Sequence, residues 1–146
     1  MLNIDQDLIY RYIRPLEFNS SRPNVLQYSK FGGICLALKI NYITSTIEFS
    51  YSRCPLSKLI DLSVAKLIAS KRFKTNEKIV IPHDPSIPIK ENVYIFLKKN
   101  KHELNDNAKN LWQAIKRIEN LSKQEKQKFI KFEHNAHVQV VKSYFS

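Results

Sequence analysis

The sequence predicts an α+β fold: a small antiparallel sheet packed by a central amphipathic helix, followed by a helical C-terminal region. Hydrophobic residues alternate with other residues over 34–40 and 47–51, as in strands, and recur at helical spacing over 55–72. The chain has 146 residues, 43% of them hydrophobic, which is enough for one core. We expect residues 1–97 to form an α+β core and residues 98–146 a basic helical region packed on it as one domain.

The N-terminal residues predict a helix that begins at Asn3 or Asp5 and ends near Arg14. Pro15 would end this helix, because the residue before a proline is disfavoured in the helical conformation. Residues 16–30 are rich in Asn, Ser and Pro, which is typical of a loop. The helix would present one apolar face, formed by Leu8, Ile9, Tyr12 and Ile13.

A β-hairpin is the clearest element of the sequence. It follows Gly32 and Gly33, and its strands cover residues 34–40 and 47–51 with a short turn between them. One face of this hairpin is strongly apolar and must be covered by another element. The side chains on that face are Ile34, Leu36, Leu38, Ile40, Ile47, Phe49 and Tyr51.

The helix expected over residues 55–72 is the predicted cover. Pro55 suits the first position of a helix, where its missing N–H is not needed. We expect the apolar face to lie on the hairpin. The opposite face, smooth at its alanines, would suit a nucleic-acid groove, a partner helix or a second helix of the same domain. The apolar face holds Leu56, Leu59, Ile60, Val64 and Leu67, and the opposite face Lys58, Asp61, Ala65, Ala69 and Arg72.

The stretch between residues 78 and 97 predicts two more strands, over residues 78–81 and 93–97. Three prolines between them predict a stiff, extended connection. Together with the hairpin, these strands would give a sheet of three or four strands.

The C-terminal region predicts two helices. Asn105 or Asp106 would cap the first, and Ser122 with Glu125 forms the S-x-x-E pattern of a capping box that starts the second. Residues 137–145 fit either a strand or a continued helix, and both alternatives stay open. The first helix would pack through Ala108, Leu111, Trp112, Ile115 and Ile118.

Positive charge is the main indication of function. Lys and Arg number 24 against 13 acidic residues, for a net charge of +11. Eight Phe, seven Tyr and one Trp argue for a folded protein rather than a disordered basic segment. A polyanion-binding surface is predicted; the alternative is an ordinary solvated surface in a Lys-rich proteome. The expected nucleic-acid-binding residues are Arg53, Lys58, Lys66, Lys71, Arg72, Lys98, Lys99, Lys109, Lys116, Arg117, Lys123 and Lys128.

Motifs for nucleotide and metal chemistry are missing from the sequence. Two adjacent glycines are the only ones, and neither a GxGxxG nor a GxxxxGK[ST] pattern occurs, which argues against Rossmann and P-loop sites. The spacing of His134 and His137 would allow two metal ligands on a helix, but no further ligands accompany them. His83 and Asp84 could act in acid–base chemistry, although an Asp-Pro turn is the simpler interpretation. We expect no enzyme activity, no cofactor and no metal.

The two cysteines are expected to be reduced and buried. Cys35 and Cys54 could pair if their strands are neighbours, so that alternative stays open. Cys54 precedes the expected helix, whose dipole would lower the pKa of a thiol there. Packing is the simpler role for Cys54, and we do not assign it as a nucleophile.

The chain carries no indication of secretion or membrane insertion. Residues 1–10 hold two aspartates and no basic region, unlike a signal peptide. No apolar run approaches the ~18 residues of a transmembrane helix. We therefore expect a cytoplasmic protein with no membrane partner.

Residues 33–73 resemble a group of small uncharacterised proteins of phages and mobile elements. The resemblance lies in two strands, the run Ser52-Arg53-Cys54-Pro55, and a basic amphipathic helix ending over residues 68–73. Phe73 stands where an aliphatic residue is usual, and Lys66 near where an Arg is common. The resemblance covers about a quarter of the chain and implies a viral or mobile-element origin, with no particular activity.

Together these features predict a small basic phage or mobile-element protein that binds DNA or RNA without catalysis. The alternative is a protein-binding inhibitor or modulator of a host defence or transcription nucleoprotein complex. The sequence does not determine the oligomeric state. In the alternative, exposed tyrosines would supply contacts, and the candidates are Tyr10, Tyr42, Tyr94 and Tyr144.

Overall fold

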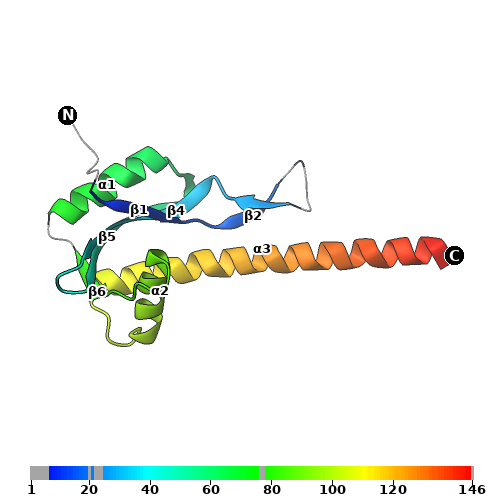
Figure 1. Ribbon diagram of the computed structural model, residues 1–146. Helices are drawn as coiled ribbons and strands as arrows, with labels where there is room; N and C mark the ends of the chain where they lie inside the picture. Colours follow the sequence, from blue (N-terminus) through cyan, green and yellow to red (C-terminus); the bar gives the residue numbers. More distant parts are fainter. Residues whose placement is uncertain (1–6, 20, 22–24, 76–77, 146) are drawn as a thin grey trace.

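The computed structural model describes residues 7–19, 21, 25–75 and 78–145, with side chains described as far as residue 128. Over these residues it confirms the α+β prediction (Figure 1). The elements are β1 (Ile9–Ile13), β2 (Leu16–Phe18), β3 (Leu26–Tyr28), β4 (Phe31–Asn41), β5 (Thr46–Leu59), α1 (Leu62–Lys74), β6 (Ile79–Pro82), α2 (Ile89–Lys99) and α3 (Asp106–Phe145).

An antiparallel sheet in the order β1-β4-β5-β6 forms the middle layer of the molecule. The predicted hairpin is confirmed as β4 and β5, with Leu36 opposite Tyr51 and Ile40 opposite Ile47. The strand predicted over 78–81 is confirmed as β6, which pairs with the start of β5. The strands β2 and β3 form a separate two-stranded sheet.

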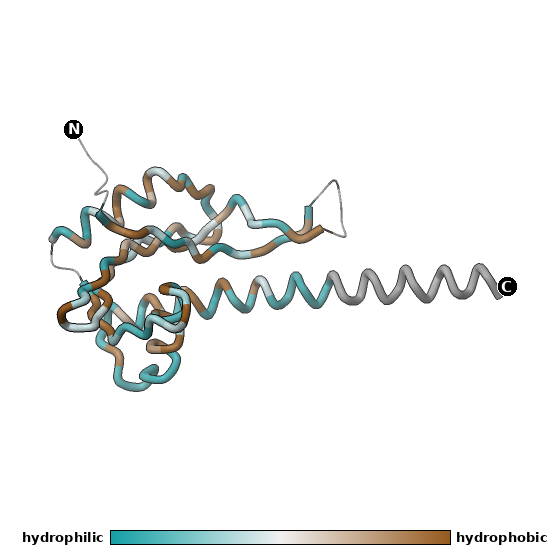
Figure 2. The backbone as a smooth tube through the Cα atoms, viewed as in Figure 1, coloured by the Kyte–Doolittle hydropathy of each residue, from teal (hydrophilic) through white to brown (hydrophobic). Residues whose placement is uncertain are grey.

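The two faces of the sheet differ in side-chain size, and this difference separates the helices into two layers. Ile34, Leu36 and Leu38 point to one face and are buried against α2 and the first part of α3. Cys35 and Ala37, which alternate with them, point to the other face and pack against α1. Figures 1 and 2 show the resulting arrangement, with α1 on one side of the sheet and α2 and α3 on the other.

The predicted packing of the central helix is wrong. The face that packs on the sheet holds Ala65, Ala69 and Phe73, whereas Val64 and Ile68 are exposed. Small side chains on both surfaces let the helix approach closely, so that the Ser52 Oγ donates a hydrogen bond to the Ala65 carbonyl at 2.8 Å. The alanine stripe is therefore covered by the sheet and is not available to a nucleic acid.

The start of that helix is also later than predicted. Strand β5 continues through Pro55, and Asp61 caps α1 by accepting hydrogen bonds from the Ser63 and Val64 N–H groups. The β4–β5 register shifts between Phe31 and Gly33, which places Pro55 in an irregular part of the strand, where a missing N–H is tolerated. Gly32 is required here, because its φ is +74° and a Cβ would lie 2.8 Å from the Leu56 Cα.

Within the predicted N-terminal helix, Ile9–Ile13 form a strand, β1, that pairs with β4 from Ile9 opposite Leu38 to Ile13 opposite Ile34. The expected start at Asn3 or Asp5 lies outside the described residues. The apolar residues of this segment fit both periods, and pairing with the otherwise open edge of β4 decides between them. Residues 16–30, predicted as a loop, contain the β2–β3 hairpin.

The strand predicted over residues 93–97 is part of α2. Val93 and Leu97 are buried one helical turn apart against the sheet, whereas Tyr94 and Phe96 between them are half-buried and Ile95 is exposed. The β-branched and aromatic content of this stretch favours a strand, but burial of a single stripe on the sheet selects the helix.

Helix α3 is one continuous element of 40 residues, about 60 Å long at 1.5 Å per residue. It begins where predicted, with the Asn105 Oδ1 accepting a hydrogen bond from the Ala108 N–H. The capping box at Ser122 and Glu125 does not start a new helix, and residues 137–145 are helical. Figure 1 shows that α3 leaves the sheet and extends well beyond it. Of the predicted packing residues, Trp112 is half-buried and Ala108, Leu111, Ile115 and Ile118 are buried.

Replacing Ala69 by Leu should destabilise the protein, because the added carbons have no space between α1 and the small residues of the sheet. We expect the free energy of unfolding to fall by about 1–3 kcal/mol in urea denaturation followed by circular dichroism. The matched control is Ile68→Leu on the outer face of the same helix, which should change it by less than about 0.5 kcal/mol. Equal effects of the two substitutions would contradict the assigned packing of α1.

Candidate nucleic-acid interface

The edge of β5 beyond Ser50 is not covered by another strand within the described residues, because β6 pairs only with Thr46 to Phe49. The Arg72 Nη1 of α1 donates a hydrogen bond of 3.0 Å to the Tyr51 carbonyl at this edge. Since backbone groups alternate in direction along a strand, Arg53 presents its N–H and C=O to the same edge. An uncovered edge thus lies between α1 on one face of the sheet and α3 on the other.

Three arginines from three elements meet at this edge: Arg53 of β5, Arg72 of α1 and Arg117 of α3. Arg53 and Arg72 line a hollow of about 380 Å³ together with Tyr51 and Asn110. Arg53 and Arg117 line an adjoining hollow of about 310 Å³. No carboxylate is among the lining residues of either hollow. We call Arg53, Arg72 and Arg117 the arginine edge.

The arginine edge has the chemistry of a phosphate site. Guanidinium groups donate two parallel hydrogen bonds to phosphate oxygens, and they keep their charge at any physiological pH. Arg72 is held in place by its bond to the Tyr51 carbonyl, and the Tyr51 hydroxyl donates to the Asn107 carbonyl of α3 at 3.0 Å. This arrangement ties the strand to both helices, so less side-chain freedom is lost when an anion binds.

Several of the other basic residues predicted to bind nucleic acid are engaged within the protein. Lys116 and Lys128 form ion pairs with Glu119 and Glu125, at 3.4 Å and 3.1 Å. The Lys66 Nζ lies 5.3 Å from the centre of the Tyr10 ring. These three side chains therefore contribute less to an outward positive field than the sequence suggests.

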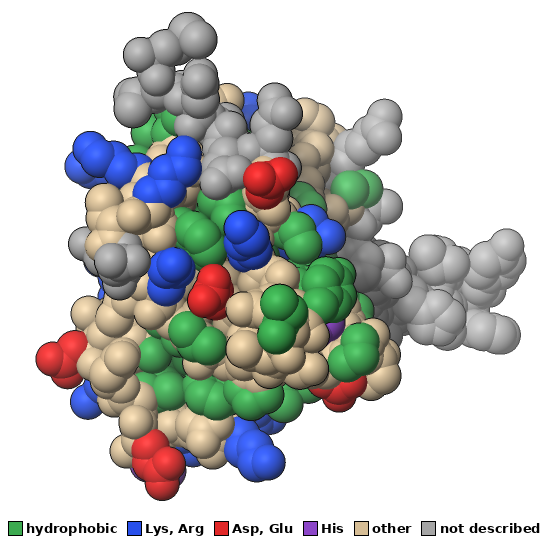
Figure 3. All heavy atoms as spheres, turned by 60° about the vertical axis from the view of Figure 1, so that its left-hand side comes forward, with side chains coloured by type: hydrophobic (Ala, Val, Ile, Leu, Met, Phe, Trp, Pro, Cys, Tyr) green, Lys and Arg blue, Asp and Glu red, His purple; other side chains and the backbone are tan. Residues whose placement is uncertain are grey.

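The remaining predicted residues are spread over the surface. Figure 3 shows a face on which Lys and Arg lie among carboxylates and apolar side chains and do not form one continuous patch. Five residues are exposed away from both hollows of the arginine edge, and Lys123 lines a different cavity. The five exposed residues are Lys58, Lys71, Lys98, Lys99 and Lys109.

A second cavity, of about 480 Å³, lies on the other flank of α3. It is an open cavity lined by β1, the β2–β3 sheet, α2 and α3, and we call it the tyrosine cavity. Sequence reasoning missed it because its residues were assigned to a helix and a loop. No pattern within one segment indicates it, because its lining residues come from β1, β2, β3, α2 and α3. Its aromatic and charged residues are Tyr12, Tyr28, Tyr94, Arg14, Lys90, Lys123, Lys126, Glu91 and Glu119.

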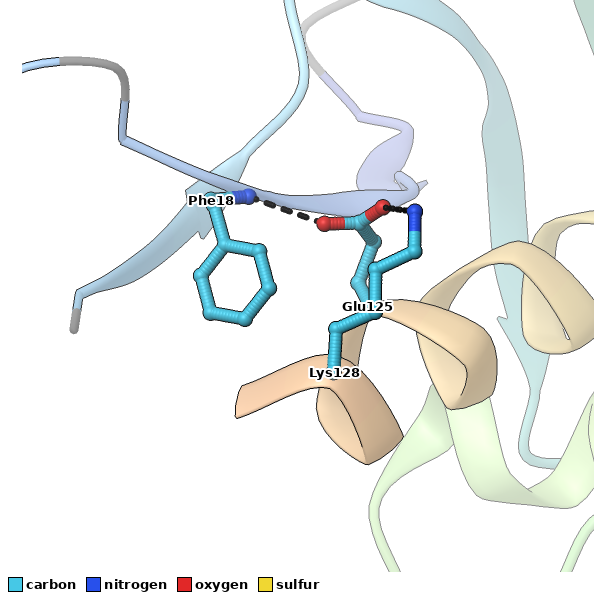
Figure 4. A network of polar contacts seen from close by, with 3 residues as sticks. All are labelled: Phe18, Glu125 and Lys128. Carbon is cyan, nitrogen blue, oxygen red and sulfur yellow. Dashed lines mark hydrogen bonds and ion pairs between the residues drawn. The ribbon is translucent and has the colours of Figure 1, made fainter. Parts of the chain in front are cut away.

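The two residues of the predicted capping box, Ser122 and Glu125, hold one wall of the tyrosine cavity in place. The Ser122 Oγ accepts a hydrogen bond from the Leu16 N–H at 3.1 Å. The Glu125 Oε2 accepts one from the Phe18 N–H at 3.2 Å, while its other oxygen pairs with Lys128 (Figure 4). Both side chains thus act on β2, more than a hundred residues away in sequence, instead of capping a helix.

The Tyr12 ring packs beside Cys35 on the α1 face of the sheet, away from the tyrosine cavity, whereas Tyr94 lines the cavity. Both phenols are uncharged at physiological pH. Burial, with a smaller contribution from the neighbouring Cys35 thiol, raises the pKa of Tyr12 to about 12. Burial and the hydrogen bond to the Glu119 carboxylate raise the pKa of Tyr94 to about 12. Tyr10 and Tyr94, suggested as exposed contacts, are half-buried, whereas Tyr42 is exposed; the side chain of Tyr144 lies outside the described residues.

The cysteines are free thiols, and neither lies at a helix N-terminus. Cys35 is buried as predicted, and burial raises its pKa to about 11. Cys54 is half-buried within β5, with its Sγ near the Lys58 carbonyl at 3.5 Å. The two do not face each other in the hairpin, since Cys35 is opposite Ser52 and Cys54 opposite Gly33.

The described side chains of His83 and Asp84 are not arranged for catalysis. The Asp84 Oδ1 accepts hydrogen bonds from the Ser86 N–H and hydroxyl, which lower the pKa of that carboxyl, as expected for a turn. His83 packs edge-on against Tyr42. His134 and His137 have side chains outside the described residues. Among the residues that were described, no group of three or more His, Cys, Asp or Glu is placed to hold a metal ion.

No helix in the described part of the chain is long and apolar enough to cross a membrane. No protein-family model, curated protein or solved structure matches this chain.

Alkylation of the native protein with iodoacetamide at pH 8 should label Cys54 and leave Cys35 unmodified. Cys35 is buried, and a pKa of about 11 leaves only ~0.1% of it as the reactive thiolate at that pH. Mass spectrometry of tryptic peptides would measure both sites, with the denatured protein, in which both react, as the control. Comparable labelling of the two cysteines in the native protein would contradict this assignment.

Glu125→Ala should loosen the β2–β3 sheet from α3, because the Phe18 N–H loses its acceptor. We expect the Phe18 amide to exchange with deuterium at least about 10-fold faster, which corresponds to roughly 1.4 kcal/mol for a bond to a charged group. Gln124→Ala, an exposed position one residue away, is the control and should leave this rate unchanged. An unaltered Phe18 rate in the Glu125 variant would show that the hydrogen bond does not hold the strand.

Proposed function

We propose that this protein binds nucleic acid without catalysis and that the arginine edge is the centre of its interface. The observation that supports this most strongly is the convergence of Arg53, Arg72 and Arg117 on two adjoining hollows with no carboxylate among their lining residues. Such a site attracts phosphate groups, because no negatively charged side chain among the lining residues repels them.

A polymer explains the whole charge distribution better than a small anion does. A single phosphate would need only the arginine edge, yet the chain has a net charge of +11. Exposed lysines also lie on the last turn of α1, at the end of α2 and along α3. A nucleic acid lying across the edge would meet these charges in turn and release counterions at each contact. Origin in a phage or mobile element, and action in the cytoplasm, stay predictions from the sequence.

The alternative function, inhibition or modulation of a host nucleoprotein complex through protein contacts, has one observation in its favour. Aliphatic side chains are exposed at the end of β5 and on the outer face of α1, where Leu59 is 67% exposed and Ile68 42%. Together with Val64 and the neighbouring Lys71 they could contact another protein. A stoichiometric protein partner that is retained after nuclease treatment and at ~0.5 M salt would support this alternative.

The proposal is tested by the salt dependence of binding to labelled single-stranded DNA, duplex DNA and RNA. In the variant Arg53→Gln/Arg117→Gln, the plot of log affinity against log salt should become shallower by about 2, because two phosphate contacts are lost. The control Lys116→Gln/Lys128→Gln removes the same charge from residues already paired with glutamates, and its slope should change little. Fluorescence anisotropy over a salt series measures all three proteins.

Three results would count against this proposal. Equal slopes for the two double variants would remove the arginine edge from the interface, and absence of measurable binding by the wild type would remove nucleic acid as the ligand. Cleavage of the labelled strands in the presence of Mg²⁺ would show that the protein is a nuclease instead.

A further inference from the structure

The tyrosine cavity and the arginine edge lie on opposite flanks of the same helix. On α3, Ala114 and Arg117 line the hollow at the arginine edge, whereas Ile115, Glu119 and Ser122 line the tyrosine cavity; Ile118 reaches both. Because the two sites share one helix, a flexible chain crossing α3 could occupy both. The chemistry of the tyrosine cavity indicates which part of that chain it would take.

Flat apolar surfaces dominate the inside of the cavity. Tyr28 is 59% exposed there, and the Arg14 guanidinium carbon lies 5.1 Å from the centre of its ring. Tyr94 is fixed deeper inside by an edge-on contact with Trp112, at 5.6 Å between ring centres. A volume of about 480 Å³ is within the range of small-ligand sites. Aromatic rings and arginine planes of this kind stack on nucleobases of any sequence.

The charge around these rings is positive on balance. Arg14, Lys90, Lys123 and Lys126 line the cavity with two carboxylates, Glu91 and Glu119, and Glu119 is already paired with Lys116 at 3.4 Å. Lys123 and Lys126 form no ion pair within the described residues. The Arg14 Nε is buried with no hydrogen-bond partner among them either. A negatively charged group at the mouth of the cavity would therefore be favoured.

We propose that the tyrosine cavity binds an unpaired nucleobase, with the adjoining phosphate at Lys123 and Lys126, and that the nucleic acid bound is single-stranded. This proposal rests on the proposed function and names its substrate class. In a duplex the faces of the bases are stacked on one another, so a duplex could meet the arginine edge but could not fill the cavity.

The test compares two labelled single strands of about 12 nucleotides, one of thymidines and one of abasic sites with the same number of phosphates. The strand with bases should bind at least about 5-fold more tightly, which corresponds to the stacking of one base. Tyr28→Leu should lower its affinity to that of the abasic strand, whereas Tyr28→Phe, which keeps the ring, should not. The control Tyr42→Leu removes an exposed tyrosine outside the cavity and should change nothing.

A second measurement needs no variant. The fluorescence of 2-aminopurine placed within the strand should fall when the wild-type protein binds, because the base becomes stacked on an aromatic ring. Equal affinity for base-containing and abasic strands, or unchanged 2-aminopurine fluorescence, would overturn the single-strand proposal. If binding still depended on salt, the arginine edge would remain the proposed nucleic-acid interface. Failure of every strand, abasic included, to bind would overturn the proposed function itself.

Discussion

Close packing of α1 on a surface of small side chains is the contact on which the rest of the arrangement depends. Cys35 and Ala37 leave room only for a helix that presents Ala65 and Ala69. The large side chains that alternate with them are left to the other face, where two helices are needed to bury them. Helix α3 therefore lies on the face of the sheet that carries the large side chains. One flank of α3 lies beside the uncovered part of β5 and the other beside the β2–β3 sheet.

Local patterns predicted the elements whose partners are close in sequence. The β4–β5 hairpin and the start of α3 at Asp106 are of this kind. The misassigned segments have distant partners: β1 pairs with β4 across the β2–β3 hairpin, and Glu125 accepts from Phe18. An S-x-x-E pattern says nothing about a donor more than a hundred residues away, so its use on β2 could not be inferred from spacing.

The candidate sites also differ in how much of them local sequence patterns could predict. Counting charges identified Arg53, Arg72 and Arg117 among a dozen basic residues, but their convergence depends on topology and could not be read from their spacing. The lysines at positions 116 and 128 lie one helical turn from glutamates, so the ion pairs were visible in the sequence. The residues that meet at the edge are all arginines. This is consistent with the greater suitability of the planar guanidinium for crowded, partly desolvated positions.

The uncovered part of β5 also bears on self-association through the edge of the sheet. A free strand edge is a template on which a second chain can add a strand. Here Arg53 and Lys58 place charge along the edge, Pro55 lacks an N–H group, and Arg72 occupies the Tyr51 carbonyl. Charge, proline and irregular register are the features by which natural sheets stay monomeric at their edges. The same side chains would thus serve colloidal stability as well as ligand binding, and neither property could change during evolution without affecting the other.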